Sequence, residues 1–373
     1  MVTQPFKFDF GPEDAAAEGY VKVGPDCAYD EERGYGFLEL AGVSAKAREE
    51  GGHGLQHSFC IPFNAAFTVD VPNGNYTVSV LSGDDIVPTC TTIKAGVGRI
   101  VIRDAKTAPG QYIRSLFSVN VRNGKLKLAF SGKAPRLNAL EITPNSQSAT
   151  LFLAGDSTVT DQPEDGFPYG GWGQMLSLYL KHDIVVSNHA ESGRSSKSFI
   201  DEGRLDVIVS EMKPNDFLFI QFGHNDQKPD EERHTDPLTT YPQYLKRYID
   251  VAREKGAFPV LITSVHRRFF DEEGKISNTH GEYLDAVRRL AADEGVPLID
   301  LAEKSKELFE ALGEEGTKTI FLWGSPGEFM NFSEGIQDNT HFQEQGAVRI
   351  AKLVAEEIRD RRIRPLELYL RGL

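Results

Sequence analysis

The sequence has little cysteine. It contains three, Cys27, Cys60 and Cys90, all within the first quarter of its 373 residues. An odd number of cysteines without a C-x-x-C spacing argues against a disulfide framework and against a zinc site. Buried cysteine usually packs as a small hydrophobic side chain. We therefore expect free, partly buried thiols, and a catalytic cysteine is the less favoured interpretation.

Long apolar runs are also missing. The longest ones are far shorter than the roughly 18 residues that a membrane-spanning helix needs. The start of the chain, from Met1 to Phe10, has no basic segment followed by an apolar stretch, so we expect no secretory signal peptide. The sequence therefore predicts a cytoplasmic protein without a membrane partner.

Positive charge is scarce as well, since the formal net charge is −14. Nucleic acid is a disfavoured partner, because binding to it depends on neutralising phosphates. An anionic substrate would need a local basic patch. The length of 373 residues suggests two domains, because one domain typically takes ~150 residues. An apolar content of 40% is enough for sizeable cores.

Residues 1–145 have the pattern of an all-β domain. Apolar and polar residues alternate in short runs that turn residues separate. Many short strands without helical spacing are typical of an antiparallel sandwich or jelly roll. The turns at Pro72–Gly74 and Asn123–Gly124 predict hairpins, because Asn-Gly between alternating runs favours them. The expected strands are 7–10, 20–23, 67–71, 76–81, 99–103, 116–122, 125–130 and 136–142.

Residues 150–373 form the second predicted domain, after a short polar linker at 144–149. Here apolar strands alternate with segments whose apolar residues recur every three or four positions. Such alternation predicts an α/β fold, with a parallel sheet covered by helices on both faces. The expected strands are 150–154, 183–187, 216–221, 258–263 and 297–301, and the expected helical stripes lie within 172–180, 244–252, 283–291 and 347–358.

Reactive residues follow the first three of these strands. Ser157 follows the first, 188–195 the second and 222–226 the third, and 337–342 precedes the last helix. In a parallel sheet the carboxyl ends of the strands open on the same edge, where α/β proteins bind ligands. The sequence therefore predicts that these segments meet in one crevice.

These residues suit acyl transfer by an activated serine. Ser157 would be the nucleophile, His341 the base that takes its proton, and Asp338 the carboxylate that orients the imidazole. The backbone N–H groups of Ser157 and Gly193 and the side-chain amide of Asn225 would bind the oxyanion, at about 3–4 kcal/mol per donor. The alternatives are ordinary turn roles for Ser157, Gly193 and Asn225, and a helix cap for Asp338.

The motifs resemble a known superfamily. Over residues 150–360 the chain is similar to the four blocks of the SGNH (GDSL-type) hydrolases, and more specifically to the rhamnogalacturonan acetylesterases. The resemblance implies a flavodoxin-like, three-layer α/β/α fold. It also implies an enzyme that removes acetyl groups from galacturonic acid residues and needs no metal or organic cofactor. The N-terminal half resembles a galactose-binding-like sandwich. The matching blocks are Gly155-Asp-Ser-Thr, Gly193-Arg-Ser, Phe222-Gly-His-Asn-Asp and Asp338-Asn-Thr-His-Phe.

Five further residues are candidates for contact with the substrate. Trp172 could stack on a sugar ring or begin a helix's core stripe. Arg194 and His266 could pair with uronate carboxylates or be solvated surface groups. Asp156 could also order its turn through backbone N–H bonds. His224 is expected as a pocket wall or a hydrogen-bonded loop residue, because no carboxylate lies at triad spacing from it.

The preferred interpretation is a serine esterase that deacetylates imported pectic oligosaccharides through an acetyl-enzyme. An acetylxylan or other sugar-ester deacetylase is the second interpretation. A carbohydrate-binding protein with an inert hydrolase half is the third, and the complete Ser, Gly, Asn, Asp and His set argues against it. A lipase is less favoured, since no exposed apolar lid helix is evident.

Overall fold

The computed structural model describes residues 5–48 and 54–372. The chain divides into two compact units. The first holds Met1–Ser148 with the segment Lys181–Val185, and the second holds Ala149–Leu180 with Val186–Leu373. The predicted domains, 1–145 and 150–373, do not assign Lys181–Val185 to the first unit. The predicted division into these two domains remains a prediction.

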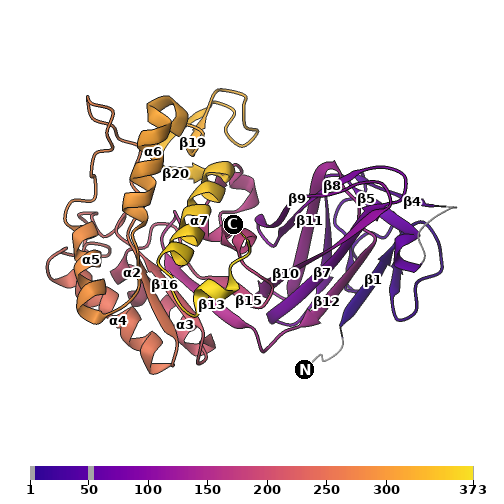
Figure 1. Cartoon of the computed structure of the whole chain (residues 1–373), viewed down its shortest axis with the longest axis horizontal. Coiled ribbons are helices and arrows are strands. Elements are labelled where there is room, and N and C mark those ends of the chain that lie inside the picture. Colours follow the sequence, from indigo (N-terminus) through magenta and orange to yellow (C-terminus); the bar gives the residue numbers. More distant parts are fainter. Residues whose placement is uncertain (1–4, 49–53, 373) are drawn as a thin grey trace. The chain divides into compact units, whose positions relative to one another are not determined.

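The first unit is a β-sandwich of two five-stranded sheets (Figure 1). One sheet has the order β10 (Gln111–Val121), β7 (Gly74–Asp84), β12 (Ala139–Pro144), β1 (Phe6–Phe10) and β2 (Val21–Val23). The other has the order β3 (Tyr35–Phe37), β6 (Ala65–Asp70), β11 (Lys125–Ala134), β8 (Thr89–Ala95) and β9 (Arg99–Thr107). A separate pair joins β4 (Val43–Ala47) to β5 (Ser58–Pro62). The predicted all-β architecture is thus confirmed.

Alternation of side chains builds the core of this sandwich. In β11 the buried residues are Leu126, Leu128 and Phe130, two positions apart, so one face of the strand is apolar. Phe10 and Phe67 from opposite sheets meet edge to face, with ring centroids 5.2 Å apart. Such aromatic pairs add about 0.5–1.5 kcal/mol beyond the burial of their area.

The two Asn-Gly turns do not form the predicted hairpins. The turn at Pro72–Gly74 joins β6 to β7 and Asn123–Gly124 joins β10 to β11, and in both cases the two strands belong to different sheets. The turns are therefore arches between the sheets. They also bind each other, since the N–H of Gly124 donates to the Asn73 side chain at 2.8 Å.

The second unit is built on a five-stranded sheet. Its order is β15 (Ile184–Asn188), β13 (Ala149–Gly155), β16 (Phe217–Gln221), β17 (Phe258–Ile262) and β18 (Leu298–Ile299) (Figure 1). The pairs β13–β16, β16–β17 and β17–β18 are parallel. Counted along the chain this order is 2-1-3-4-5, the flavodoxin-like order, whose ligand crevice lies between the first and third strands. The predicted fold class is confirmed, and the expected crevice lies between the ends of β13 and β16.

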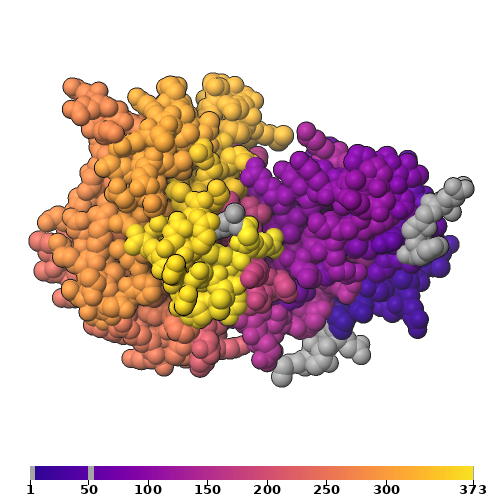
Figure 2. Space-filling view, in the orientation of Figure 1, coloured from indigo at the N-terminus to yellow at the C-terminus, as the bar shows by residue number. Residues whose placement is uncertain are grey.

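Amphipathic helices cover this sheet. In α4 (Thr240–Glu254) the buried residues Tyr241, Leu245, Tyr248, Ile249 and Ala252 form one stripe, which packs with α3 (Arg204–Glu211) and α5 (Tyr283–Glu294) in a single core. The helix α7 (Glu344–Asp360) contacts α1 (Trp172–Met175) and α6 (Leu301–Thr317), and its outer side forms part of the surface (Figure 2). Among residues 5–48 and 54–372 no helix has both the length and the apolar character of a membrane span.

One helix prediction and one strand prediction need correction. The stripe at 172–180 is not one helix, because the α-helical turn of α1 passes into a 3₁₀ turn, η3 (Leu176–Tyr179), after which Leu180 becomes extended and bridges Leu370. The strand expected at 297–301 is only β18, and Leu301 begins α6. Asp300 caps that helix by accepting from the N–H of Glu303. The Asp-x-x-Glu spacing there was a readable start signal.

Candidate active site

Ser157 lies just beyond the end of β13. Asp156 orders the turn, because its Oδ1 accepts from the Thr158 N–H at 2.9 Å and from the Thr158 hydroxyl at 2.7 Å. The residue before it must be small: a Cβ on Gly155 would lie 2.7 Å from Val159 and 3.0 Å from the Gln221 carbonyl oxygen. Glycine thus lets the strand end and the turn pack closely.

Two side-chain contacts join Ser157 to His341 and His341 to Asp338. The Ser157 Oγ lies 2.9 Å from His341 Nε2. His341 Nδ1 lies 2.7 Å from Asp338 Oδ2. Both Asp338 and His341 lie on a strand, β20 (Ile336–Gln343), which pairs with β14 (Tyr169–Gly170) and β19 (Phe321–Gly324). The structure brings together the three residues that the sequence selected from opposite ends of the domain.

Asp338 is held in its ionised form. Burial alone would raise its pKa, but the hydrogen bond and charge of His341 and the backbone N–H groups of Thr340 and His341 lower the pKa to about 2. Its Oδ1 accepts both N–H bonds, at 2.7 and 2.9 Å. A fixed carboxylate of this kind keeps the proton of the neutral imidazole on Nδ1 and leaves Nε2 as the acceptor that faces Ser157.

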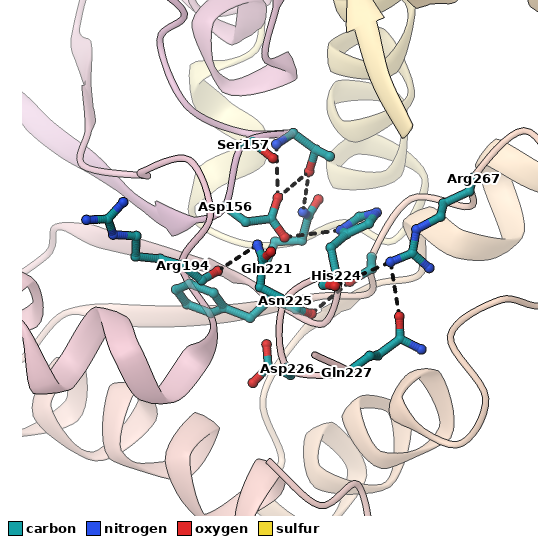
Figure 3. Close-up of polar contacts among 12 residues, drawn as sticks. Asp156, Ser157, Arg194, Gln221, His224, Asn225, Asp226, Gln227 and Arg267 are labelled. Atoms are coloured by element: carbon teal, nitrogen blue, oxygen red, sulfur yellow. Dashed lines mark hydrogen bonds and ion pairs between the residues drawn. The ribbon is translucent and has the colours of Figure 1, made fainter. Parts of the chain in front are cut away.

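Gly193 lies in the loop after β15 and Asn225 in the loop after β16, the two strands on either side of β13. The side-chain amide of Asn225 donates one N–H to the Arg194 carbonyl oxygen at 3.1 Å (Figure 3). An amide nitrogen carries a second N–H, and this bond fixes the plane in which it points. Gly193 has a φ of 82°, which favours glycine, and a Cβ there would meet no atom within 4 Å. The role of both residues as oxyanion donors stays a prediction.

Asp226 is a residue that sequence reasoning overlooked. It is fully buried, and its carboxylate accepts from the Ser196 N–H at 3.1 Å and from the Thr235 hydroxyl at 3.0 Å. Burial raises its pKa to about 6. It joins the loop after β16 to the start of α2 (Ser196–Asp201) and so holds the segment that carries Asn225.

The contact of Tyr169 with His341 was not predicted from the sequence. Its ring packs edge-on against the His341 imidazole, with centroids 5.0 Å apart and planes at 63°. Burial raises its pKa, and Ser157 and Ser192 oppose the rise. Tyr169 comes from β14, which pairs with β20, so only the long-range pairing of strands reveals this contact.

Three of the candidate substrate contacts have buried side chains. Trp172 has no exposed surface, and its Nε1 donates to Gln221 Oε1 at 2.8 Å, so it begins a core stripe instead of stacking on sugar. Asp156 is 0% exposed and both of its carboxylate oxygens have partners inside the fold. His266 is likewise buried. Arg194 is 32% exposed, and its guanidinium pairs with Glu202 at 3.0 Å.

His224 has the carboxylate partner that the sequence did not indicate. Its Nδ1 lies 3.1 Å from Asp156 Oδ2 (Figure 3). The sequence has no carboxylate at triad spacing from His224, and the partner that the structure gives it comes from 68 residues earlier in the chain. His224 is thus a buried, hydrogen-bonded loop residue, which is one of the two expectations for it.

Two more histidines lie behind His224. The His280 ring meets the His224 ring edge-on at 4.8 Å, and His266 lies 5.9 Å from His280. Within the described residues, both ring nitrogens of His280 and the Nδ1 of His266 lack a hydrogen-bond partner. Burial lowers the pKa of His266 from 6.5 to about 4, and burial and neighbouring positive groups hold the pKa of His280 well below 6.5. In the described residues no group of three His, Cys, Asp or Glu side chains is placed to hold a metal ion.

This cluster predicts a loss of stability in mild acid. Above pH 6.5 neither the folded nor the unfolded state protonates these histidines. Below pH 6.5 the unfolded state protonates both, whereas the folded state protonates His266 only near pH 4 and His280 only well below pH 6.5. The free energy of unfolding should then fall by about 1.4 kcal/mol per pH unit for each such histidine. Urea unfolding at several pH values should show a smaller fall for His280→Phe, which keeps a ring but cannot titrate.

Comparing the pH dependence of wild type with that of His280→Phe cancels the contributions of other titrating groups to the free energy of unfolding. Asp226 is one of these groups, and its raised pKa changes stability in the opposite direction. An identical pH dependence in wild type and His280→Phe would contradict the expected effect of His280.

Each half of the chain matches a known protein family. Residues 153–349 match the GDSL-like lipase/acylhydrolase family, and residues 6–142 match the galactose-binding domain-like family of β-agarase and YxiM-like esterases. The uncharacterised esterase YxiM of Bacillus subtilis is 29% identical over 95% of this chain and 90% of its own length. The crystal structure of YxiM has a TM-score of 0.54 and covers 97% of this chain and 99% of that one.

The second half has a more similar relative. The rhamnogalacturonan acetylesterase RhgT of Bacillus subtilis is 51% identical over 56% of this chain and 89% of its own length. The rhamnogalacturonan acetylesterase of Emericella nidulans is 28% identical over 51% of this chain and 82% of its own length.

Proposed function

Because this chain belongs to the GDSL-like lipase/acylhydrolase family, we propose that it is a serine acetylesterase acting on acetylated rhamnogalacturonan oligosaccharides. It is a carboxylic ester hydrolase that carries a galactose-binding-like domain. The observation that supports the mechanism most strongly is the Ser157–His341–Asp338 series of contacts, at 2.9 and 2.7 Å. The relatives named above support the choice of substrate.

The reaction proceeds in two halves. The Ser157 Oγ attacks the acetyl carbonyl carbon as its proton passes to His341 Nε2, and Asp338 stabilises the imidazolium that forms. The N–H groups of Ser157, Gly193 and Asn225 bind the oxyanion. The intermediate collapses when His341 returns the proton to the sugar oxygen, which releases the sugar and leaves Ser157 acetylated.

Water completes the cycle. His341 takes a proton from a water molecule, which attacks the acetyl-enzyme carbonyl and passes through a second tetrahedral intermediate. Collapse of that intermediate releases acetate and returns the proton to Ser157. No metal ion or organic cofactor has a step in this scheme.

The substrate is tested by quantifying acetate from two panels of acetylated oligosaccharides. One panel derives from rhamnogalacturonan and the other from xylan, at matched ester concentrations. We expect kcat/KM to be at least about 10-fold higher on the rhamnogalacturonan panel, because discrimination depends on differential binding of the transition state. Equal or faster release from the xylan panel would contradict the proposed substrate and favour the acetylxylan interpretation.

A further inference from the structure

The loop that carries the nucleophile and the loop that carries the amide donor are joined by a buried contact between a carboxylate and an imidazole. Asp156 directly precedes Ser157, and His224 directly precedes Asn225. Asp156 Oδ2 and His224 Nδ1 lie 3.1 Å apart, with side chains 0% and 5% exposed. Figure 3 shows the carboxylate and the imidazole pointing toward each other between the two loops.

The Asp156 side of this contact is rigid. Burial raises the pKa of Asp156, yet His224 and the two groups of Thr158 outweigh that effect and keep the pKa below its ordinary value. The Thr158 hydroxyl in turn accepts from Gln221 Nε2 at 2.9 Å, and Gln221 lies at the end of β16. The carboxylate is therefore fixed from the strand as well as from its own turn.

The His224 side is held from two further directions. The ring packs edge-on against His280. The His224 carbonyl oxygen accepts from Arg267 Nη2 at 3.3 Å, and the same nitrogen donates to Gln227 Oε1 at 3.1 Å. Since His224 is restrained by these contacts, its position also sets the position of Asn225, the next residue.

We propose that Asp156 and His224 form a positioning pair, which sets the distance between the Ser157 hydroxyl and the Asn225 amide. Neither residue touches the substrate in this arrangement. The inference rests on the proposed function, because it gives Ser157 and Asn225 their catalytic roles. Displacement of a reacting group by about 1 Å can lower a rate about 100-fold, so the pair should influence kcat more than KM.

Two substitutions of His224 separate the hydrogen bond from the ring. His224→Asn keeps a donor nitrogen at the same distance from Cβ as Nδ1 but removes the ring. His224→Phe keeps a ring against His280 but has no donor. We expect His224→Phe to lower kcat for para-nitrophenyl acetate by about 10- to 100-fold with KM within about threefold, and His224→Asn to retain most of kcat.

The control variants are His234→Asn and His234→Phe, at an exposed histidine of the same unit whose Nδ1 lies 3.0 Å from the Lys228 carbonyl oxygen, where kcat should change less than about twofold. The acid limb of the pH–rate profile should keep the wild-type midpoint in His224→Phe, because the base is His341. A normal kcat in His224→Phe, a loss in His224→Asn that equals or exceeds the loss in His224→Phe, or a shifted acid limb would each overturn the proposal.

Asp156→Asn supplies the same test if His224→Phe fails to fold. It removes the charge and keeps an oxygen for Thr158, and an unchanged kcat in this variant would also overturn the proposal. Ser157→Ala distinguishes failure of the positioning pair from failure of the proposed function. If Ser157→Ala is inactive and His224→Phe is normal, only the positioning pair is wrong, whereas an active Ser157→Ala contradicts the proposed function itself.

Discussion

Ser157→Ala is expected to lower kcat for acetyl-ester hydrolysis by at least about 10³-fold, because it removes the atom that attacks the ester. The fold should persist. The Ser157 Oγ contacts His341 Nε2, whereas the Ser157 carbonyl oxygen accepts from Gln162 Nε2 at 2.8 Å and is unaffected by the substitution. Initial rates with para-nitrophenyl acetate and thermal unfolding of the same samples measure the two expectations.

Ser210→Ala is a matched control for this substitution. Ser210 lies on α3 and its hydroxyl donates to the Val207 carbonyl oxygen, away from the three residues of the site. Its activity should equal that of the wild type. Turnover by Ser157→Ala within about 10-fold of wild type, in a folded protein, would mean that another group is the nucleophile.

Asp338→Asn is expected to lower kcat by on the order of 10³- to 10⁴-fold with little change in stability. An asparagine oxygen can still accept from the N–H groups of Thr340 and His341, as Asp338 Oδ1 does. Its NH₂ group then faces His341 Nδ1, which must become an acceptor. The imidazole proton moves to Nε2, which can no longer take the proton of Ser157.

The pH dependence of the wild type provides an independent check on Asp338. Because the pKa of Asp338 is lowered to about 2, its carboxylate stays charged through the mildly acidic range. Protonation of Asp338 should therefore not contribute to the acid limb of kcat above about pH 3. If Asp338→Asn keeps activity within about 10-fold of wild type, Asp338 does not orient the base.

Much of this arrangement was readable from the sequence, because strands, turns and four short blocks are local patterns. The position of Ser157 after an apolar run, and the order of helices and strands after residue 150, were sufficient to predict the sheet edge at which the site lies. Asp338 and His341 are three residues apart, so their contact was also within reach of local reasoning.

What the sequence did not indicate depends on contacts between distant segments. The Asp156–His224 pair joins two loops that meet only because β13 and β16 are neighbours in the sheet. The Asn123–Gly124 turn fits a hairpin and an arch equally well, and only the partition of β10 and β11 between two sheets decides. Trp172 could face solvent or the core until the position of Gln221 was known.

The most direct test of the account is to identify the residue that becomes acylated. The enzyme is mixed with para-nitrophenyl acetate, quenched in acid during the first turnover and digested, and the acetylated peptide is sequenced by mass spectrometry. The account predicts that the acetyl group is on Ser157 and is absent from Ser157→Ala. Acetylation of a different residue that turns over at the rate of catalysis, with Ser157 unmodified, would contradict it.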